Sequence, residues 1–264
     1  MKFGLIGHPI AHSLSPALFK AGYEGRYLYE LIEGKDFEES YKRFLEEYDG
    51  INVTAPFKEL AFAKADILSP ECETIGATNL LVKTSEGVKA YNSDYLGVKM
   101  WMETVIEDLS GVARFSNPLS PSPAVKALVI GLGGAGKAAA AAAESLGMEV
   151  IRMNRTVRDE RTRPLEDFRE CFKNADIIIY NIPASIPALN DLTASDFNPG
   201  KSKFILEANY KDPSFTPDIL ERMKKANPQA EYTGGRIWLL YQALTGYEIF
   251  TGAKPDLRKM SDVL

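Results

Sequence analysis

Residues 126–136 read Lys-Ala-Leu-Val-Ile-Gly-Leu-Gly-Gly-Ala-Gly, and a run of six alanines at 138–143 follows closely. The β-forming start predicts a buried strand, and the alanines predict a helix that can lie close to a sheet. A glycine-rich turn between a strand and a helix lets backbone amides approach a pyrophosphate, whose charge the helix dipole favours. The segment therefore predicts a nucleotide-binding turn, with a tight structural turn as the alternative, at Gly131, Gly133, Gly134, Ala135 and Gly136.

Strands and helices are expected to alternate on both sides of this turn. We expect helices at 36–48, 136–146, 164–172 and 237–250, and strands at 2–6, 26–32, 51–54, 79–83, 126–130, 149–153, 176–180 and 203–206. A polar turn at 84–87 before 88–91 predicts a hairpin or a pair of neighbouring strands. This alternation is typical of α/β proteins, and the second half has the pattern of a doubly wound nucleotide-binding sheet. Prolines and serines at 110–123 predict a loop, near which we place the connection between two domains.

The composition is that of an ordinary globular protein. The chain has 264 residues, 45% hydrophobic and 25% charged, with a formal net charge of -5. This charge argues against nucleic acid or an anionic membrane as the main partner, and no apolar run approaches the ~18 residues of a membrane helix. Cys72 and Cys171 lack metal-ligand spacing, so we expect reduced thiols in a cytoplasmic protein. His8 and His12 are expected to be loop residues, so no metal is predicted.

The identity of the nucleotide depends on the end of the second strand after the turn. NAD-binding proteins place an acidic residue there, about 20 residues on, to hold the ribose hydroxyls. This chain instead has Asn154, Arg155 and Thr156, with Arg158 close behind. An arginine can pair bidentately with a 2′-phosphate, so the sequence predicts NADP. A solvated basic loop paired with neighbouring acids is the alternative.

A second motif, Asn-Val-Thr-Ala-Pro-Phe-Lys at 52–58, places a lysine among amides and hydroxyls, and Asp94 follows downstream. Ketone reduction needs a proton delivered to oxygen, which Lys58 can supply or mimic by its charge, while a neighbouring carboxylate orients the ammonium. The alternative is that Lys58 merely begins a helix after Pro56 and that Asp94 caps the next helix.

These motifs, in this order, resemble the shikimate dehydrogenase family. The other matching segments are Ser-Leu-Ser at 13–15, Gly-Ala-Thr-Asn at 76–79 and Asn-Ser-Asp at 92–94. The resemblance implies an N-terminal α/β substrate domain, 1–103 plus 237–264, and a Rossmann-like NADP domain, 104–236, with a cleft between them. It implies NADPH-dependent, reversible reduction of 3-dehydroshikimate to shikimate in aromatic amino acid and chorismate biosynthesis. The rivals are a quinate/shikimate dehydrogenase accepting NAD or quinate, and a non-catalytic NADP-binding sensor.

The family's residue roles carry over to matching positions. The resemblance implies catalysis by Lys58 and Asp94, substrate binding by Ser13, Ser15, Thr54, Asn79, Tyr210 and Gln242, and cofactor contacts from the glycine turn, Asn154, Arg155, Thr156, Arg158 and Gly235. Ser13 and Ser15, whose side chains point alike if the segment is extended, would hold the substrate carboxylate. The generic alternatives are turn-forming serines, a strand-edge threonine and a helix-surface glutamine. We expect a monomer or homodimer with a small-molecule substrate.

Three segments depart from the family pattern. Residues 181–185 read Asn-Ile-Pro-Ala-Ser, where the family usually has Asn-Ala-Thr followed by Gly-Met. Glu207 stands for the usual aspartate before the tyrosine segment, and Tyr95 stands for the glycine after Asp94. The first departure concerns contacts to the nicotinamide ribose.

Overall fold

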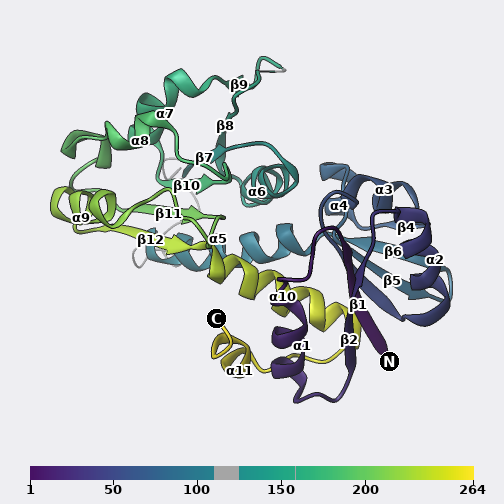
Figure 1. Ribbon diagram of the computed structural model, residues 1–264. Helices are drawn as coiled ribbons and strands as arrows, with labels where there is room; N and C mark the ends of the chain where they lie inside the picture. The colour runs from purple at the N-terminus through teal and green to yellow at the C-terminus, as the bar shows by residue number, and fades with distance from the viewer. Residues whose placement is uncertain (110–124, 158) are drawn as a thin grey trace, which may run out of the picture. The chain divides into compact units, whose positions relative to one another are not determined.

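The computed structural model describes residues 1–109, 125–157 and 159–264, and it divides into two compact units (Figure 1). The first unit is Met1–Gly97 with Leu239–Leu264, and the second is Val98–Trp238. Both divisions fall inside long helices, α5 (Ser93–Leu109) and α10 (Gly235–Thr251). The boundaries expected from sequence, at 103/104 and 236/237, lie in the same two helices. The loop expected at 110–123 lies outside the described residues.

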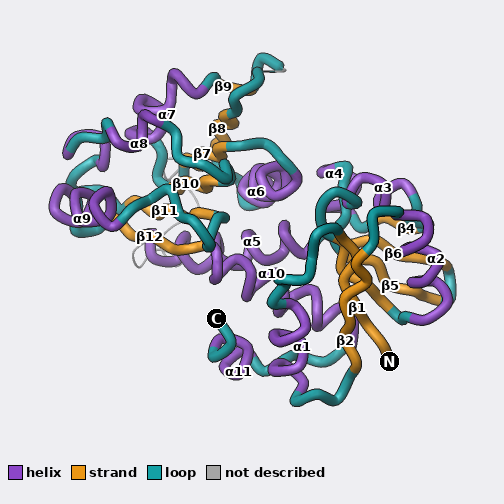
Figure 2. Tube along the Cα trace, in the orientation of Figure 1, coloured by secondary structure: helices purple, strands orange, loops and turns teal. Residues whose placement is uncertain are grey.

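The first unit contains a six-stranded mixed sheet (Figure 2). Its order is β2 (Leu28–Glu33), β1 (Lys2–Gly7), β3 (Gly50–Val53), β5 (Leu80–Thr84), β6 (Gly87–Tyr91) and β4 (Ile67–Leu68). Strands β2, β1 and β3 are parallel, whereas β5 is antiparallel to both of its neighbours. The predicted hairpin is present, with Thr84 opposite Gly87. The sheet thus changes from parallel to antiparallel pairing between β3 and β5.

Helices pack on both faces of this sheet because strand side chains alternate between faces. Ile6 of β1 packs with residues of α2 (Phe37–Glu47) and α3 (Lys58–Ala63). Phe3 packs with α1 (Ser15–Tyr23), the C-terminal part of α10 and α11 (Leu257–Ser261). A short helix, α4 (Pro70–Ile75), precedes β5. Because α11 packs with Phe3, the last residues of the chain belong to the core of the first unit.

The second unit has the predicted parallel sheet. Its order is β12 (Ala230–Gly234), β11 (Lys203–Glu207), β10 (Ile177–Tyr180), β7 (Lys126–Ile130), β8 (Glu149–Met153) and β9 (Thr162–Arg163). Every pair of neighbours is parallel. The helical segments are α6 (Gly134–Ser145), η1 (Leu165–Asp167), α7 (Phe168–Asn174), α8 (Pro187–Asn190), η2 (Ala194–Phe197) and α9 (Pro217–Ala226). This is a Rossmann-like α/β unit.

Two details differ from the sequence expectations. The helix expected at 164–172 begins later than predicted. Pro164 is followed by a short 3-10 turn, η1, and the α-helix α7 begins at Phe168. The elements absent from the expected set are α1, α4, α8, α9, α11, β4, β9 and β12, although at α9 Thr216 accepts a capping hydrogen bond from Ile219 N and Pro217 begins the helix. Among the helices of the described residues, none is both long and apolar enough to cross a membrane.

Candidate active site

The structure brings Lys58 and Asp94 together in the first unit. Lys58 is the first residue of α3, and Asp94 lies in the first turn of α5. Lys58 Nζ lies 2.5 Å from Asp94 Oδ2, and the two side chains are 24% and 12% exposed. Partial burial weakens solvent screening of such a pair, while the remaining exposure leaves the ammonium accessible. The pair can therefore present a fixed proton donor to a small molecule.

The cap that the sequence allowed for Asp94 is supplied by another residue. Asn92 Oδ1 accepts a hydrogen bond from Tyr95 N at 3.1 Å, the usual N-cap contact. Asn92 Nδ2 donates to Ala77 O at 3.1 Å, which fixes the amide's orientation. The capping alternative for Asp94 is therefore wrong, and its carboxylate faces Lys58 instead.

Asn79 joins the segments that carry this pair. Its side-chain Oδ1 accepts hydrogen bonds from Ser93 N at 2.7 Å and Ser93 Oγ at 3.2 Å. Its neighbour Thr78 donates its N–H to Lys58 O at 3.4 Å. Asn79 is only 4% exposed, so its hydrogen bonds to Ser93 are well shielded from water. Asn79 thereby ties the start of α5 to the strand-loop segment beside α3.

The serine pair lies in a turn rather than in an extended segment. Leu14 between them is helical (φ -81°, ψ -8°), and Ser15 begins α1. Ser13 Oγ donates to Ser15 Oγ at 3.1 Å and accepts from Ser15 N at 3.2 Å. The segment is not extended, so the condition under which the two side chains would point alike is not met. A local hydroxyl turn brings them together instead.

Thr54 lies next to the loop that carries the serines. It directly follows β3, and its N–H donates to Ile6 O at 2.9 Å. A Cβ on Gly7 would overlap the Thr54 methyl group and would lie 2.7 Å from Ile10 Cγ2. Glycine at position 7 therefore permits the close approach of Thr54 to the loop after β1.

Gln242 is placed by a close crossing of α5 and α10. A Cβ on Gly97 would overlap Gln242 N and lie 2.8 Å from Gln242 Cα. One turn further along α10, a Cβ on Gly246 would lie 3.2 Å from Ser93 Cβ. Small residues on both helices thus bring their backbones together. Gln242 lies at this crossing rather than on an open helix surface. We call Lys58, Asp94, Asn79, Thr54, Ser13, Ser15 and Gln242 the substrate-side group.

The glycine turn of the second unit has the geometry expected for phosphate binding. Gly131 has φ +85°, and its N–H donates to Met153 O at 2.8 Å. A Cβ on Gly136 would overlap Gly131 O, so the turn closes only around glycine. Gly133 is the N-cap of α6 and provides no side-chain cap, and Gly133 and Gly134 are exposed. The N–H groups of the first turn thus remain open to an anion.

Arg155 follows β8 and is exposed. Asn154 Nδ2 donates to Thr156 O at 3.2 Å, which orders the backbone on both sides of the arginine. Asp159 Oδ1 accepts from Arg161 N at 2.9 Å, and within the described ranges no carboxylate forms an ion pair with Arg155. The acidic partners of the solvated-loop alternative are thus absent for Arg155 within these ranges, whereas its exposure agrees with both interpretations. Arg158 lies outside the described residues.

The unusual segment 181–185 packs against the glycine turn. Asn181 N donates to Ile130 O at 2.8 Å, and a Cβ on Gly136 would lie 3.5 Å from Asn181 Nδ2. Asn181 Oδ1 is buried without a hydrogen-bond partner in the part of the chain that is described. Tyr180 OH donates to Ala184 O at 2.8 Å and holds the loop that follows. The segment is an ordered neighbour of the turn.

Tyr210 and Gly235 both lie in the second unit. A Cβ on Gly235 would overlap Ala208 O, so glycine permits α10 to begin against the loop after β11. Glu207, which replaces the family's aspartate, is completely buried and accepts hydrogen bonds from Phe215 N at 3.2 Å and Tyr232 OH at 2.8 Å. It anchors the loop that contains Tyr210. The proposed ligand contacts of Tyr210 and Gly235 remain predictions.

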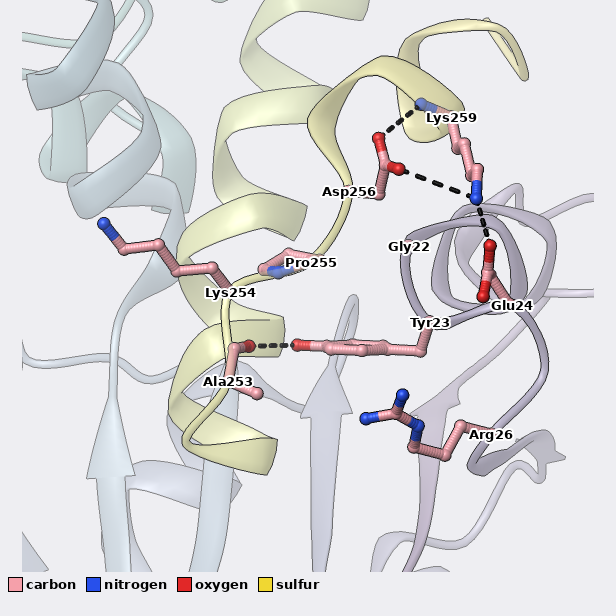
Figure 3. A pocket seen from close by; sticks show the side chains of 9 residues that line it. All are labelled: Gly22, Tyr23, Glu24, Arg26, Ala253, Lys254, Pro255, Asp256 and Lys259. Carbon is pink, nitrogen blue, oxygen red and sulfur yellow. Dashed lines mark hydrogen bonds and ion pairs between the residues drawn. The ribbon is translucent and has the colours of Figure 1, made fainter.

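A cavity of about 350 Å³ in the first unit involves none of the predicted residues (Figure 3). It is lined by Gly22, Tyr23, Glu24, Arg26, Ala253, Lys254, Pro255, Asp256 and Lys259. Tyr23 OH donates to Ala253 O at 2.8 Å, and Lys259 pairs with Glu24 and Asp256. These contacts connect α1 to the segment leading into α11, so the cavity belongs to a structural joint. Across the described residues, no cluster of three or more His, Cys, Asp or Glu could hold a metal ion.

The motifs of the sequence do not by themselves identify the residues that support the substrate-side group. These are Asn92 and Ser93, within the Asn-Ser-Asp segment, and the glycines at 7, 97 and 246. One available signal was the spacing of four that separates Ser93 from Gly97 on one helix and Gln242 from Gly246 on the other. Small residues at this spacing are typical of close helix crossings.

Comparisons with known proteins agree with this geometry. Residues 5–81 match the model for the shikimate dehydrogenase substrate binding domain, and 116–206 match that for the NAD binding domain of D-isomer specific 2-hydroxyacid dehydrogenases. The chain is 27% identical over 283 residues to shikimate dehydrogenase (NADP(+)) of Carboxydothermus hydrogenoformans, covering 99% of this chain and 95% of that protein. It is 29% identical to a shikimate dehydrogenase (NADP(+)) of Thermus thermophilus, covering 99% and 97%.

The solved structures include a similar protein with ligands bound. Shikimate 5-dehydrogenase from Thermus thermophilus, in complex with NADP(H) and shikimate, superposes with a TM-score of 0.74 at 28% identity. The match covers 100% of this chain and 98% of that one. The likeness therefore extends over both units and both motifs.

Proposed function

The chain belongs to the shikimate dehydrogenase family, and from this premise we propose that it is an NADP-dependent oxidoreductase that reversibly reduces 3-dehydroshikimate to shikimate. The observation that carries the proposal is the Lys58–Asp94 pair, whose Nζ and Oδ2 atoms lie 2.5 Å apart. The family connects this activity to chorismate and aromatic amino acid biosynthesis.

The substrate-side group has the functional groups that a hydroxylated acid requires. Lys58 can donate a proton to the developing alkoxide or stabilise its charge, and Asp94 keeps the ammonium in place. We propose that Ser13 and Ser15 donate hydrogen bonds to the carboxylate of the substrate, for which the Ser13 hydroxyl would exchange the hydrogen bond that it donates to Ser15 Oγ at 3.1 Å for one to the carboxylate. Thr54, Asn79 and Gln242 would hold the ring hydroxyls, and Tyr210 remains a further proposed contact.

The glycine turn and Arg155 fit NADP. The open N–H groups of α6 would hold the pyrophosphate, and Gly131 and Gly136 lack the side chains that would obstruct the turn. Arg155, with Asn154 and Thr156 beside it, would read the 2′-phosphate, since its guanidinium has no carboxylate partner in the described chain. When bound, the nicotinamide supplies or accepts the hydride.

The test is oxidation of shikimate by the purified protein, followed by the absorbance of the reduced cofactor. We expect turnover with shikimate and NADP and little turnover when NAD or quinate is substituted. Comparable turnover with NAD or quinate would identify the broader quinate/shikimate enzyme instead. NADPH binding without turnover in any combination would favour the non-catalytic sensor, which the unusual 181–185 segment motivates. A cytoplasmic location and a monomeric or homodimeric state remain predictions of the sequence.

A further inference from the structure

A buried tyrosine lies directly behind the serine pair. Tyr247 is on α10, is 1% exposed, and donates its hydroxyl hydrogen bond to Ser15 O at 3.0 Å. The two residues are far apart in sequence, so this contact exists only in the folded unit. Ser15 is the first residue of α1, and the bond therefore attaches the first turn of that helix to α10.

The surroundings of Tyr247 keep its hydroxyl as a donor. Its ring centroid lies 4.8 Å from that of Phe19, edge to face, and 5.9 Å from that of Tyr29. Burial among these rings raises the pKa of the Tyr247 hydroxyl well above its ordinary value, so it stays protonated at physiological pH. A hydrogen bond in such an apolar surrounding is shielded from competing water. The contact to Ser15 is thus persistent.

Tyr29 makes a comparable contact to a second part of the site. Its hydroxyl donates to Asn52 Oδ1 at 2.7 Å, and Asn52 Nδ2 donates to Asn79 O at 3.4 Å. The two tyrosines are therefore hydrogen-bonded to the backbone of the substrate-side group, Tyr247 directly to Ser15 O and Tyr29 through Asn52 to Asn79 O. The bond from Tyr247 is the more direct of the two.

We propose that Tyr247 is a positioning residue for recognition of the substrate's acid group, an inference that rests on the proposed function. The hydroxyl holds Ser15 O, and Ser15 in turn fixes Ser13 through two hydrogen bonds, N to Oγ at 3.2 Å and Oγ to Oγ at 3.1 Å. Lys58 and Asp94 lie on other helices, α3 and α5. Loss of the Tyr247 hydroxyl therefore weakens binding of the acid and leaves the chemical step intact.

The test compares Tyr247→Phe with a matched control, Tyr23→Phe. Tyr23 belongs to the same aromatic cluster and is 7% exposed, but its hydroxyl bonds to Tyr247 O and Ala253 O instead of to the serine segment. We expect Tyr247→Phe to raise the KM for shikimate about three- to tenfold, the value of one ordinary hydrogen bond, with kcat and the KM for NADP unchanged. Tyr23→Phe should leave the KM for shikimate unchanged. An unaltered KM in Tyr247→Phe, or equal effects of the two substitutions, would overturn the proposal.

A combined variant tests whether the effect passes through the serine pair. If Tyr247 acts through the serine pair, then Tyr247→Phe adds little to the KM of a variant that lacks both hydroxyls, Ser13→Ala with Ser15→Ala, whereas additive effects contradict the inference. Thermal unfolding of each variant shows whether it is folded. For a folded variant whose turnover is too slow for KM to be measured, calorimetry gives the dissociation constant for shikimate instead. Wild-type protein that neither oxidises nor binds shikimate would refute the proposed function itself. A normal wild type with an indifferent Tyr247→Phe would refute only the inference.

Discussion

The substrate-side group and the glycine turn are built in opposite ways. In the first, hydrogen bonds hold the polar residues: the side chain of Asn79 accepts from Ser93 N, and the backbone carbonyl of Ser15 accepts from Tyr247 OH. In the second, the essential feature is the absence of side chains, because a Cβ on Gly136 would overlap the Gly131 carbonyl. The exposed Arg155 nearby in sequence has no carboxylate partner among the described residues.

This difference shows how each region is prepared for its ligand. The substrate-side group is ordered before a substrate arrives, so removal of single polar atoms should damage it. The glycine turn leaves its donors open, so added atoms should damage it most, and its charged partner should matter only once a phosphate is present.

The largest expected effect is that of Lys58→Ala. Removal of the proton donor should lower kcat about 10²- to 10⁴-fold while NADPH affinity is retained, because the lysine acts on the substrate. Steady-state kinetics and NADPH fluorescence titration measure the two quantities. The matched control is Lys64→Ala at the C-cap of the same helix, whose ammonium pairs with Glu38 at 2.8 Å, and it should turn over normally. A normal rate in Lys58→Ala would mean that the ordered pair has no catalytic part.

The next effect concerns an added methyl group in the turn. Gly136→Ala forces the turn open and should weaken NADPH binding at least about 100-fold, because displaced amides no longer meet the pyrophosphate. The comparison is Gly133→Ala, where φ is -70° and no protein atom lies within 4 Å of the added Cβ, so the turn keeps its shape and NADPH binding should be weakened less, through contact with the pyrophosphate alone. NADPH titration of both variants decides the matter. Equal affinities would show that close packing of the turn is not what binds the cofactor.

A smaller effect is expected for the charged partner. Arg155→Ala should weaken the binding of NADPH by about 2 to 3 kcal/mol, the value of charge-assisted hydrogen bonds, and the binding of NADH much less. The quantity to measure is the ratio of the two dissociation constants in wild type and variant. Loss of affinity for both cofactors in the same proportion would mean that the arginine does not read the 2′-phosphate.

The smallest effect concerns Lys203, a side chain of the second unit that is buried and hydrogen-bonded, as Asn79 is in the first unit. Lys203 is 1% exposed, and its ammonium donates to Phe172 O at 2.7 Å and to Ala175 O at the end of α7. Burial lowers its pKa to about 8 from an ordinary 10.5. Between these values the unfolded chain binds a proton that the folded chain lacks, so stability rises with pH, and the full penalty remains below about pH 8.

Comparison with Lys203→Met isolates this contribution, since other titrating groups cancel. The free energy of unfolding of the wild type, relative to the variant, should increase by about 2 kcal/mol from pH 7.5 to 9.5. Urea unfolding at both pH values measures it. A difference that does not change with pH would indicate that the lysine keeps its proton through the whole window.

The sequence was most informative where structure depends on neighbouring residues. The strands at 126–130 and 149–153 and the hairpin of β5 and β6 follow from local apolar patterns and turn residues. The Gly131–Gly136 turn is also local, because strand, glycines and helix follow one another without interruption. Long-range order was less accessible: the two-residue strands β4 and β9, which are defined by their pairing with β6 and β8, were absent from the expected elements.

The sequence by itself determined the α/β class, the two motifs and the pairing of a lysine with a carboxylate as candidates. Tertiary structure decided which atoms meet: Asn92 rather than Asp94 caps α5, and the serines lie in a turn rather than an extended segment. It also decided the crossing of Gly97 with Gln242 and the bond from Tyr247 to Ser15. The cap and the serine turn are local contacts, but the crossing and the Tyr247–Ser15 bond join residues from distant parts of the chain. Local periodicity carries no record of the last two, because they depend on how sheets and helices pack in space.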